Sequence, residues 1–480
     1  MRQLTSLDTQ FLALEDARQT GHVAGLMVLD CADRPGGMLQ LADLMALLEE
    51  RLPLLPPLRW RLTEVPFGLD YPYWVDDSDF DLDFHVRETA LPSPGTDEQL
   101  AELTARIVSR PLDRGRPLWE LYLVSGLESG HVALLSKIHH ALIDGMSGAE
   151  IMGLLLDFSP GGRDLEPAPE RASSSARVPS GVELLARSLL GIPRYPWRAL
   201  RALPNAAPNL AQTQLGTLPG AGRVSAAIRL LTSRSLGGHA VRHNLKAPKT
   251  SFSGQISAHR RFAFGALSLD RVKAAKNRYD CTVNDVVVSL CAGAVRRWLI
   301  EHDELPDEPL VAQIPVSVRT AEQAGTYGNR ILLLGVPLLT TEADPVARLH
   351  ATSAALREMK ALHRALPAGL LTDANHFIPP AVFSRAARLS FALNTSAAGR
   401  PTWNLVVSNV PGPQFPLYCA GARMVANYPV SVITHGMGLN ITLMSYCGHL
   451  DVGIVADRDQ IPDVWRFVDW LGEELDALGV

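Results

Sequence analysis

Apolar residues along this chain follow two different periods. From Leu39 to Leu52 they return every three or four positions, which predicts an amphipathic helix. At 121–124 and 132–135 they form short unbroken runs bounded by glycine, as in buried strands. Residues 1–165 are therefore predicted to form a mixed α/β domain.

A second region with the same two patterns covers residues 255–480. Its longest apolar stretch predicts a helix over Asn284–Ile300, and a shorter helix is expected at Arg271–Tyr279. Apolar residues at helical spacing between Val464 and Leu478 predict a terminal helix packed on the core, which is the commoner cause of that pattern. Strands are expected at 311–318, 331–334, 405–408 and 439–445. Both regions place the chain in the α/β class.

The segment between these regions, residues 166–254, has a different composition. Clusters of proline and serine open it, and from 171 to 250 it carries twelve Arg or Lys against a single acid, Glu183, a net charge of +11. Its leucines and aromatic residues are interleaved with arginines, as in a basic amphipathic stretch lying on an anionic membrane. The same pattern fits a crossover segment packed between two domains. The sequence leaves both interpretations open.

Composition narrows the possible classes of protein. The chain has 480 residues, enough for two domains of ordinary size, and 47% are hydrophobic. A net charge of −5 argues against a nucleic-acid partner. No apolar run reaches the roughly 18 residues of a transmembrane helix, and the first residues lack the apolar core of a signal peptide. Five scattered cysteines without C-x-x-C spacing fit reduced thiols in a cytoplasm better than a zinc site.

The clearest candidate for chemistry is a pair of adjacent histidines, His139 and His140. In the run 132–139, which ends at this pair, successive residues are expected to face opposite sides, as in a strand that ends at the histidines. Ser147 and Glu150 have the spacing of a capping box and precede an apolar helix expected over 151–158. The histidines are therefore predicted to lie between a strand and a helix, where α/β folds commonly place active sites.

Neighbouring strand residues face opposite sides, so one histidine is expected to face a substrate and the other to orient the turn. A neutral imidazole suits the removal of a hydroxyl proton near neutral pH. Asp144 either orients the catalytic imidazole, as a triad acid does, or pairs with an arginine and holds the turn. The simplest alternative is a pair of structural histidines. Metal binding is disfavoured because the two side chains diverge and no further ligands have suitable spacing.

The sequence contains no serine nucleophile elbow, zinc-binding HExxH helix or phosphate-binding loop. The run His139-His140-x-x-x-Asp144-Gly145 instead resembles the signature of the coenzyme A-dependent acyltransferases. Over nearly its whole length the chain is similar to the bacterial bifunctional wax ester synthase/diacylglycerol acyltransferases. The other segments that carry this resemblance are Leu7–Leu12, Pro117–Trp119, Asn284–Asp285, Pro315–Arg319, Gly328–Asn329 and Ser408–Pro413.

The resemblance implies two chloramphenicol-acetyltransferase-like domains with an active-site tunnel at their interface. It implies that the second histidine, His140, is the general base, which leaves His139 to orient the loop. It also implies that Asp144, next to Gly145, is structural, and we expect Arg319 to be its partner.

Four more residues are candidates for substrate contacts. Asn284 either offers an amide near the reacting groups or caps the helix that it begins. Trp119 either lines the acyl channel or fills the core. Thr442 or Ser445 is expected to donate a hydrogen bond to the developing oxyanion, as hydroxyls do in related acyltransferases.

The expected reaction moves a long-chain acyl group from acyl-CoA, a co-substrate, to diacylglycerol, with no permanently bound cofactor and no metal. A long-chain alcohol, giving a wax ester, is the other possible acceptor, because sequence does not report tunnel shape; analogy with triacylglycerol-forming relatives favours diacylglycerol. A lipid-binding or droplet-coating protein without activity and a condensation-type acyltransferase are the alternatives. The intact histidine motif and the family's other motifs argue against them. We expect a cytoplasmic protein, peripheral on the inner membrane face or on lipid droplets.

Overall fold

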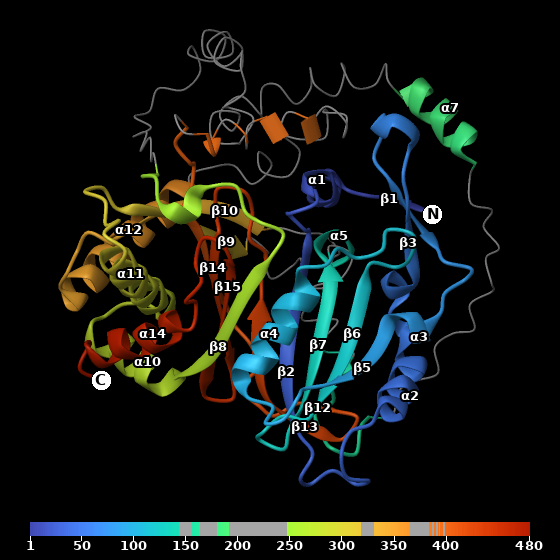
Figure 1. Cartoon of the computed structure of the whole chain (residues 1–480), viewed down its shortest axis with the longest axis horizontal. Coiled ribbons are helices and arrows are strands. Elements are labelled where there is room, and N and C mark those ends of the chain that lie inside the picture. Colours follow the sequence, from blue (N-terminus) through green and yellow to red (C-terminus); the bar gives the residue numbers. More distant parts are fainter. Residues whose placement is uncertain are drawn as a thin grey trace.

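A computed structural model of the chain describes residues 1–143, 155–163, 180–191, 247–317, 331–364 and 399–480, with a few positions at 153 and between 384 and 396. Two six-stranded sheets lie side by side, each with helices against it, and a small three-stranded sheet flanks the first of them (Figure 1). This arrangement confirms the predicted α/β class.

The first sheet has the strand order β12-β13-β2-β7-β6-β5. Its central strand is buried on both faces because successive side chains point to opposite sides. Leu134 of β7 joins the core under helix α2, whereas Leu135 joins the core under helix α4. The elements of this half are β2 His22–Asp30, β5 Val86–Ala90, β6 Trp119–Ser125, β7 Val132–His139, α1 Ser6–Leu14, α2 Leu41–Arg51, α3 Leu82–His85, α4 Asp97–Val108 and α5 His140–Ile143.

Two strands of this first sheet come from the far end of the chain. They are β12 (Tyr418–Cys419) and β13 (Ala422–Val430), and β13 pairs antiparallel with β2 over its length. The sheets therefore do not divide at the predicted boundaries of 165 and 254, because the region 255–480 supplies strands to both. A regular alternation of apolar residues predicts a strand but does not name its partner.

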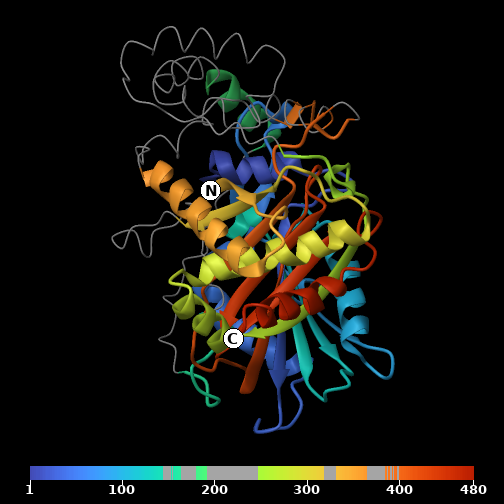
Figure 2. The same ribbon diagram turned by 90° about the vertical axis from the view of Figure 1, so that its left-hand side faces the viewer.

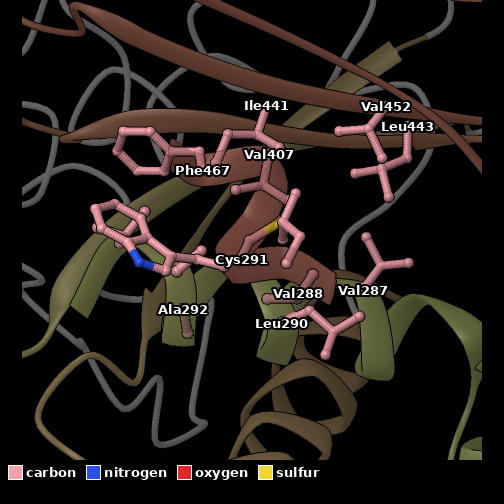
Figure 3. Packing of buried hydrophobic residues seen from close by; sticks show 14 of the residues in the cluster. Val287, Val288, Leu290, Cys291, Ala292, Val407, Ile441, Leu443, Val452 and Phe467 are labelled. Carbon is pink, nitrogen blue, oxygen red and sulfur yellow. The ribbon is translucent and has the colours of Figure 1, made fainter. Parts of the chain in front are cut away.

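The second sheet has the order β10-β9-β11-β14-β15-β8. Helices α10, α11, α12 and α14 pack on its face away from the first sheet (Figures 1 and 2). Helix α11 is apolar on nearly all sides because it lies between this sheet and three other helices (Figure 3). The elements of this half are β8 Arg260–Ser268, β9 Leu310–Ser317, β10 Ile331–Leu338, β11 Leu405–Val410, β14 Leu439–Tyr446, β15 His449–Asp457, α10 Leu269–Arg278, α11 Val283–Glu301, α12 Pro345–Arg364 and α14 Arg466–Asp476.

Most predicted elements are confirmed to within a few residues. The helices expected at 39–52, 271–279, 284–300 and 464–478 correspond to α2, α10, α11 and α14, and every predicted strand overlaps an observed one. The helix expected over 151–158 does not extend to Phe158, because Leu155 is the last of these residues in helical conformation. Asp157 instead forms a β-bridge with Tyr418 and an ion pair with Arg51. The next residue, Phe158, is 64% exposed and does not pack into the core.

The two sheets touch where the upper edge of β13 meets β14 and β15. Gly453 of β15 is required here, since a Cβ on it would lie 1.7 Å from the carbonyl oxygen of Pro429. Beside it, a buried carboxylate oxygen of Asp451 accepts a hydrogen bond from the backbone N–H of Asn427 at 2.7 Å. That N–H lies on the edge of β13 not paired with β2, so Asp451 satisfies a donor that would otherwise be buried alone.

Burial raises the pKa of Asp451 to about 6, from 3.8. The folded protein therefore holds a proton that the unfolded chain releases between these values, and the free energy of unfolding falls as the pH rises through this range. We expect Asp451→Asn to be more stable than the wild type at pH 8, by at most roughly 3 kcal/mol, and no more stable at pH 3.5.

Urea unfolding at the two pH values measures this difference. Asp270→Asn is the control, since the Asp270 side chain is 86% exposed. If the free energies of unfolding of the wild type and of D451N changed in parallel with pH, the proposed effect of Asp451 on stability would be ruled out.

Candidate active site

The two histidines lie where β7 ends and α5 begins. His139 is the last residue of the strand and pairs opposite His22 of β2, while His140 is the first residue of the short helix. Helix α1 packs directly on α5. The site is thus built from three elements: a strand end, a helix start and the N-terminal helix that covers them (Figure 1).

His139 is 1% exposed and both of its ring nitrogens are engaged. Nδ1 accepts the backbone N–H of Ala141 at 3.0 Å, and Nε2 lies 3.2 Å from Oε1 of Glu15. Because Nδ1 is an acceptor, Nε2 carries the proton and donates it to the carboxylate. His139 therefore fixes the backbone turn that begins α5.

Glu15, the C-cap residue of α1, collects three hydrogen bonds. Besides His139, its carboxylate accepts from the Gly21 backbone N–H at 2.7 Å and from the Arg114 guanidinium at 2.7 Å. Burial by itself would raise the pKa of the Glu15 carboxyl, but the hydrogen bonds from His139, Arg114 and Gly21 outweigh it and lower the pKa to about 2. Glu15 is therefore a fixed negative charge at neutral pH.

Gly21 is needed because the backbone approaches both histidines closely. A Cβ at this position would lie 2.6 Å from Nε2 of His139. The Gly21 carbonyl oxygen also accepts the backbone N–H of His140 at 2.9 Å. The segment from Glu15 to Gly21 thus contacts both histidines, one at each end.

His140 stacks on the ring of Phe11, with centroids 4.5 Å apart and planes 10° from parallel. Burial, and then the neighbouring His139, lower the pKa of His140 to about 4. Its ring is therefore uncharged at neutral pH and has a lone pair to accept a proton. Nδ1 is buried, and neither ring nitrogen has a hydrogen-bond partner among the described residues.

Asp144, Gly145 and Arg319 lie outside the described residues, as do Ser147 and Glu150 of the expected capping box. Nothing in the structure bears on the pairing of Asp144 with Arg319.

Trp119 lies in the core of the first half. Its indole N–H donates to the carbonyl oxygen of Leu58 at 2.7 Å, and its ring stacks on His85 with centroids 4.5 Å apart. Its side chain is thus used in packing and in one internal hydrogen bond.

Asn284 does not cap the helix that follows it. Thr282 is the N-cap of α11, and it forms a capping box with Asp285, whose carboxylate accepts the Thr282 N–H at 2.9 Å. The alternative that Asn284 acts as the cap is therefore wrong. Sequence favoured Asn284 because both residue types cap well and the threonine lies only two positions earlier.

Thr442 and Ser445 lie on the same strand but in different surroundings. The Thr442 hydroxyl donates to Oδ1 of Asn440 at 2.8 Å and lies 2.9 Å from the Ser431 hydroxyl. Ser431 in turn lines a small cavity between the two halves, of about 10 Å³, together with Thr20 and His22 next to the histidine pair. Thr442 therefore contacts a residue that lines this cavity.

Ser445 instead accepts the backbone N–H of Gly412 at 3.0 Å, in the loop that follows β11. It is three residues further along β14, about 10 Å at the usual strand rise, beside the hairpin that leads to β15. The hydrogen bond of the Ser445 side chain is thus with this loop and not with the histidine region.

Sequence reasoning did not single out Phe11, Glu15 or Gly21. Phe11 lies within a segment that carried the family resemblance, and Glu15 follows it at i+4, on the same helix face. That spacing was the only local signal, because contact with the histidines depends on how α1 packs on α5.

Within the described ranges no group of His, Cys, Asp or Glu is placed to hold a metal ion. A search of the same residues finds no helix long and apolar enough to cross a membrane.

The same two-unit α/β fold occurs in solved structures of other proteins. The first condensation domain of the CDA synthetase shares this fold, with a TM-score of 0.52 and 17% identity over 99% of this chain and 96% of that one. The wax ester synthase/diacylglycerol acyltransferase from Marinobacter aquaeolei VT8 is more similar. Its TM-score is 0.70, with 28% identity over 100% of this chain and 98% of that chain.

Sequence comparison identifies the family. Residues 4–287 match the wax ester synthase/diacylglycerol acyltransferase catalytic domain, and residues 327–479 match the WS/DGAT C-terminal domain. A putative diacylglycerol O-acyltransferase of Mycobacterium tuberculosis (strain ATCC 25618 / H37Rv) is 35% identical over 100% of this chain and 90% of its own length. A second putative diacylglycerol O-acyltransferase, from Mycobacterium bovis, is 34% identical over 98% of this chain and 97% of its own length.

The chain therefore belongs to the wax ester synthase/diacylglycerol acyltransferase family, and it is an acyltransferase.

Glu15→Ala removes the acceptor of three hydrogen bonds and frees the His139 ring. We expect acyl transfer to fall by roughly tenfold to a hundredfold, because a small displacement of a catalytic group is enough for such a loss. Glu15→Gln, which keeps one acceptor oxygen, should fall between this variant and the wild type.

Glu64→Ala is the matched control for this test. Glu64 also binds Arg114, at 2.9 Å, but its side chain is 60% exposed and its ion pair does not involve either histidine. Initial rates at saturating substrate compare the variants, and equal losses in E64A and E15A would contradict the role of Glu15.

Proposed function

We propose that this enzyme transfers a long-chain acyl group from acyl-CoA to the free hydroxyl of diacylglycerol, with His140 as general base. The observation that carries the proposal is the state of His140: an uncharged imidazole, held through its backbone by Gly21 and stacked on Phe11, at the junction where this fold places its histidine pair. The relatives named as diacylglycerol O-acyltransferases support the acceptor.

In the proposed reaction His140 removes the proton from the acceptor hydroxyl as the alcohol oxygen attacks the thioester carbonyl carbon. The tetrahedral intermediate collapses by breaking the carbon–sulfur bond. The coenzyme A thiolate leaves and takes the proton back from His140, so the enzyme returns to its starting state. No covalent acyl-enzyme is formed, and no metal or permanently bound cofactor takes part in the scheme.

Thr442 is the better of the two candidate oxyanion donors. It is buried and contacts Ser431, which lines a cavity together with His22, whereas the Ser445 hydroxyl accepts the backbone N–H of Gly412. To act, the Thr442 hydroxyl has to turn its proton from Asn440 to the oxyanion. The roles proposed for the other sequence candidates are orientation of the turn by His139 and support of the loop by Asp144, Gly145 and Arg319.

Release of coenzyme A thiol from a long-chain acyl-CoA tests the reaction, with diacylglycerol and a long-chain alcohol as separate acceptors. We expect acceptor-dependent release, faster with diacylglycerol, and a loss of roughly a hundredfold or more in His140→Ala. Because the pKa of His140 is about 4, kcat/KM should fall as the pH drops through that value and the base becomes protonated.

His131→Ala, at the opposite end of the same strand, is the control and should keep wild-type rates. A folded His140→Ala protein that retains the wild-type rate would remove His140 as base. Faster transfer to the alcohol would reassign the acceptor and make the enzyme chiefly a wax ester synthase.

We also propose that the enzyme works at an anionic lipid surface and docks through the end of the molecule that holds α5. Phe67, in the turn η3 (Pro66–Gly68), is 81% exposed, and Val182, at the start of α7 (Gly181–Gly191), is 77% exposed. Helix α7 packs on η3, and both lie at the same end as α5 (Figure 1). The net charge of +11 over 171–250 complements anionic headgroups.

Phe67→Ser should weaken flotation with vesicles that contain phosphatidylglycerol, and Phe67→Ser/Val182→Ser should weaken it further, because inserted apolar area is lost. Phe158→Ser is the matched control, since this 64% exposed ring follows Asp157, which bridges to β12 at the other end of the first sheet. Equal binding by all three variants and the wild type would reject this docking end.

A further inference from the structure

The segment from Glu15 to Gly21 joins α1 to β2 and runs beside both histidines. Its first residue accepts a hydrogen bond from His139, and its last accepts one from the backbone of His140. Any shift of this loop therefore moves the His139 ring or the start of α5.

The loop is stiffened from within. Oδ1 of Asp16 accepts the backbone N–H of Arg18 at 2.7 Å and of Gln19 at 2.9 Å. The buried Gln19 side chain donates to the carbonyl oxygen of Leu14 at 3.0 Å, which ties the loop to the end of α1.

Residues of the other half of the chain hold the middle of this loop. Nε2 of His435 lies 3.0 Å from Oδ2 of Asp16, and the His435 backbone N–H donates to the Gln19 side chain at 3.0 Å. The Nδ1 of His435 accepts the backbone N–H of Ile256 at 3.2 Å. His435 therefore carries a proton on Nε2 and donates it to the Asp16 carboxylate.

Arg260, at the start of β8, makes the second connection. Its buried guanidinium donates to the carbonyl oxygen of Arg18 in the loop and to those of Ser257 and His259 in its own half. Its backbone N–H donates to the Ser109 hydroxyl at 3.1 Å, just after α4. A buried guanidinium needs such acceptors, so Arg260 ties the loop to the second sheet.

We propose that Arg260 and His435 are positioning residues for acyl transfer: through Asp16, Arg18 and Gln19 they hold the Glu15–Gly21 loop, so that His140 is in its working place only while the two halves of the chain are docked. This inference rests on the proposed role of His140 as base. Neither residue touches the reacting groups in this scheme, and both act through the loop.

Asp16→Asn is the sharpest test because it changes a single contact. The substituted side chain keeps the Oδ1 acceptor for Arg18 and Gln19, but its amide turns an N–H group toward the N–H of His435. If His435 moves its proton to Nδ1, that atom meets the Ile256 N–H instead. Without that proton shift, the hydrogen bond between the two halves is lost. With it, the hydrogen bond from Ile256 that fixes the His435 ring is lost.

We expect kcat of Asp16→Asn to fall roughly tenfold or more, with KM for acyl-CoA within twofold of the wild type. Loosening of the loop also admits water to His140, so the acid limb of kcat/KM should move up from about 4 toward the ordinary histidine value of 6.5. A residue that only stabilised the fold would lower the melting temperature without moving this limb.

Asp30→Asn is the matched control. Asp30 likewise accepts a backbone N–H two residues on, from Ala32 at 2.9 Å, and pairs with Arg423 at 3.2 Å, but at the far end of β2. It should leave kcat, KM and the acid limb unchanged.

His435→Gln and Arg260→Lys break the connections from the other side, and they test the inference if Asp16→Asn folds poorly. Where Asp16→Asn folds, Asp16→Asn/His435→Gln should lose no more activity than the worse single variant if the two residues act through one contact.

Folded Asp16→Asn and His435→Gln proteins with wild-type kcat and acid limb, beside an inactive His140→Ala, would overturn this inference and leave the proposed function intact. An active His140→Ala would overturn the proposed function itself.

Discussion

The hydrogen bond between His139 and Glu15 is the contact on which the rest of the site depends. His139 has one nitrogen on the backbone of α5 and the other on the carboxylate at the end of α1, so one ring sets the position of two elements. The carboxylate remains charged because His139, Arg114 and Gly21 all donate to it. In a buried place such a network is stable only when every member has its partners.

These contacts explain why the two adjacent histidines have different surroundings. His139 has no free nitrogen and serves the backbone, whereas His140 has an uncharged ring and no hydrogen bond from it to a described residue. Burial that would be unfavourable for a charged imidazole is what keeps His140 ready to accept a proton at neutral pH. Phe11 contributes the apolar surface that maintains that burial.

The same loop that serves the histidines also connects the two halves of the chain. The first sheet takes β13 from the C-terminal region, the second sheet presses Gly453 against Pro429, and His435 and Arg260 reach the Glu15–Gly21 segment. The halves therefore share a strand, a backbone contact and a loop. The histidine pair lies beside this shared loop.

Most helices and strands, and the position of the histidine pair between a strand and a helix, could be predicted from the sequence. Helix α11 and strands β7 and β14 follow from local periodicity, and the spacing of the histidine motif identified the family, because both signals lie within short stretches of chain. Tertiary structure alone decided that β13 joins the first sheet and that Glu15 meets His139 across 124 positions. Those contacts join residues that no local pattern relates, since they depend on which surfaces pack together once the elements have formed.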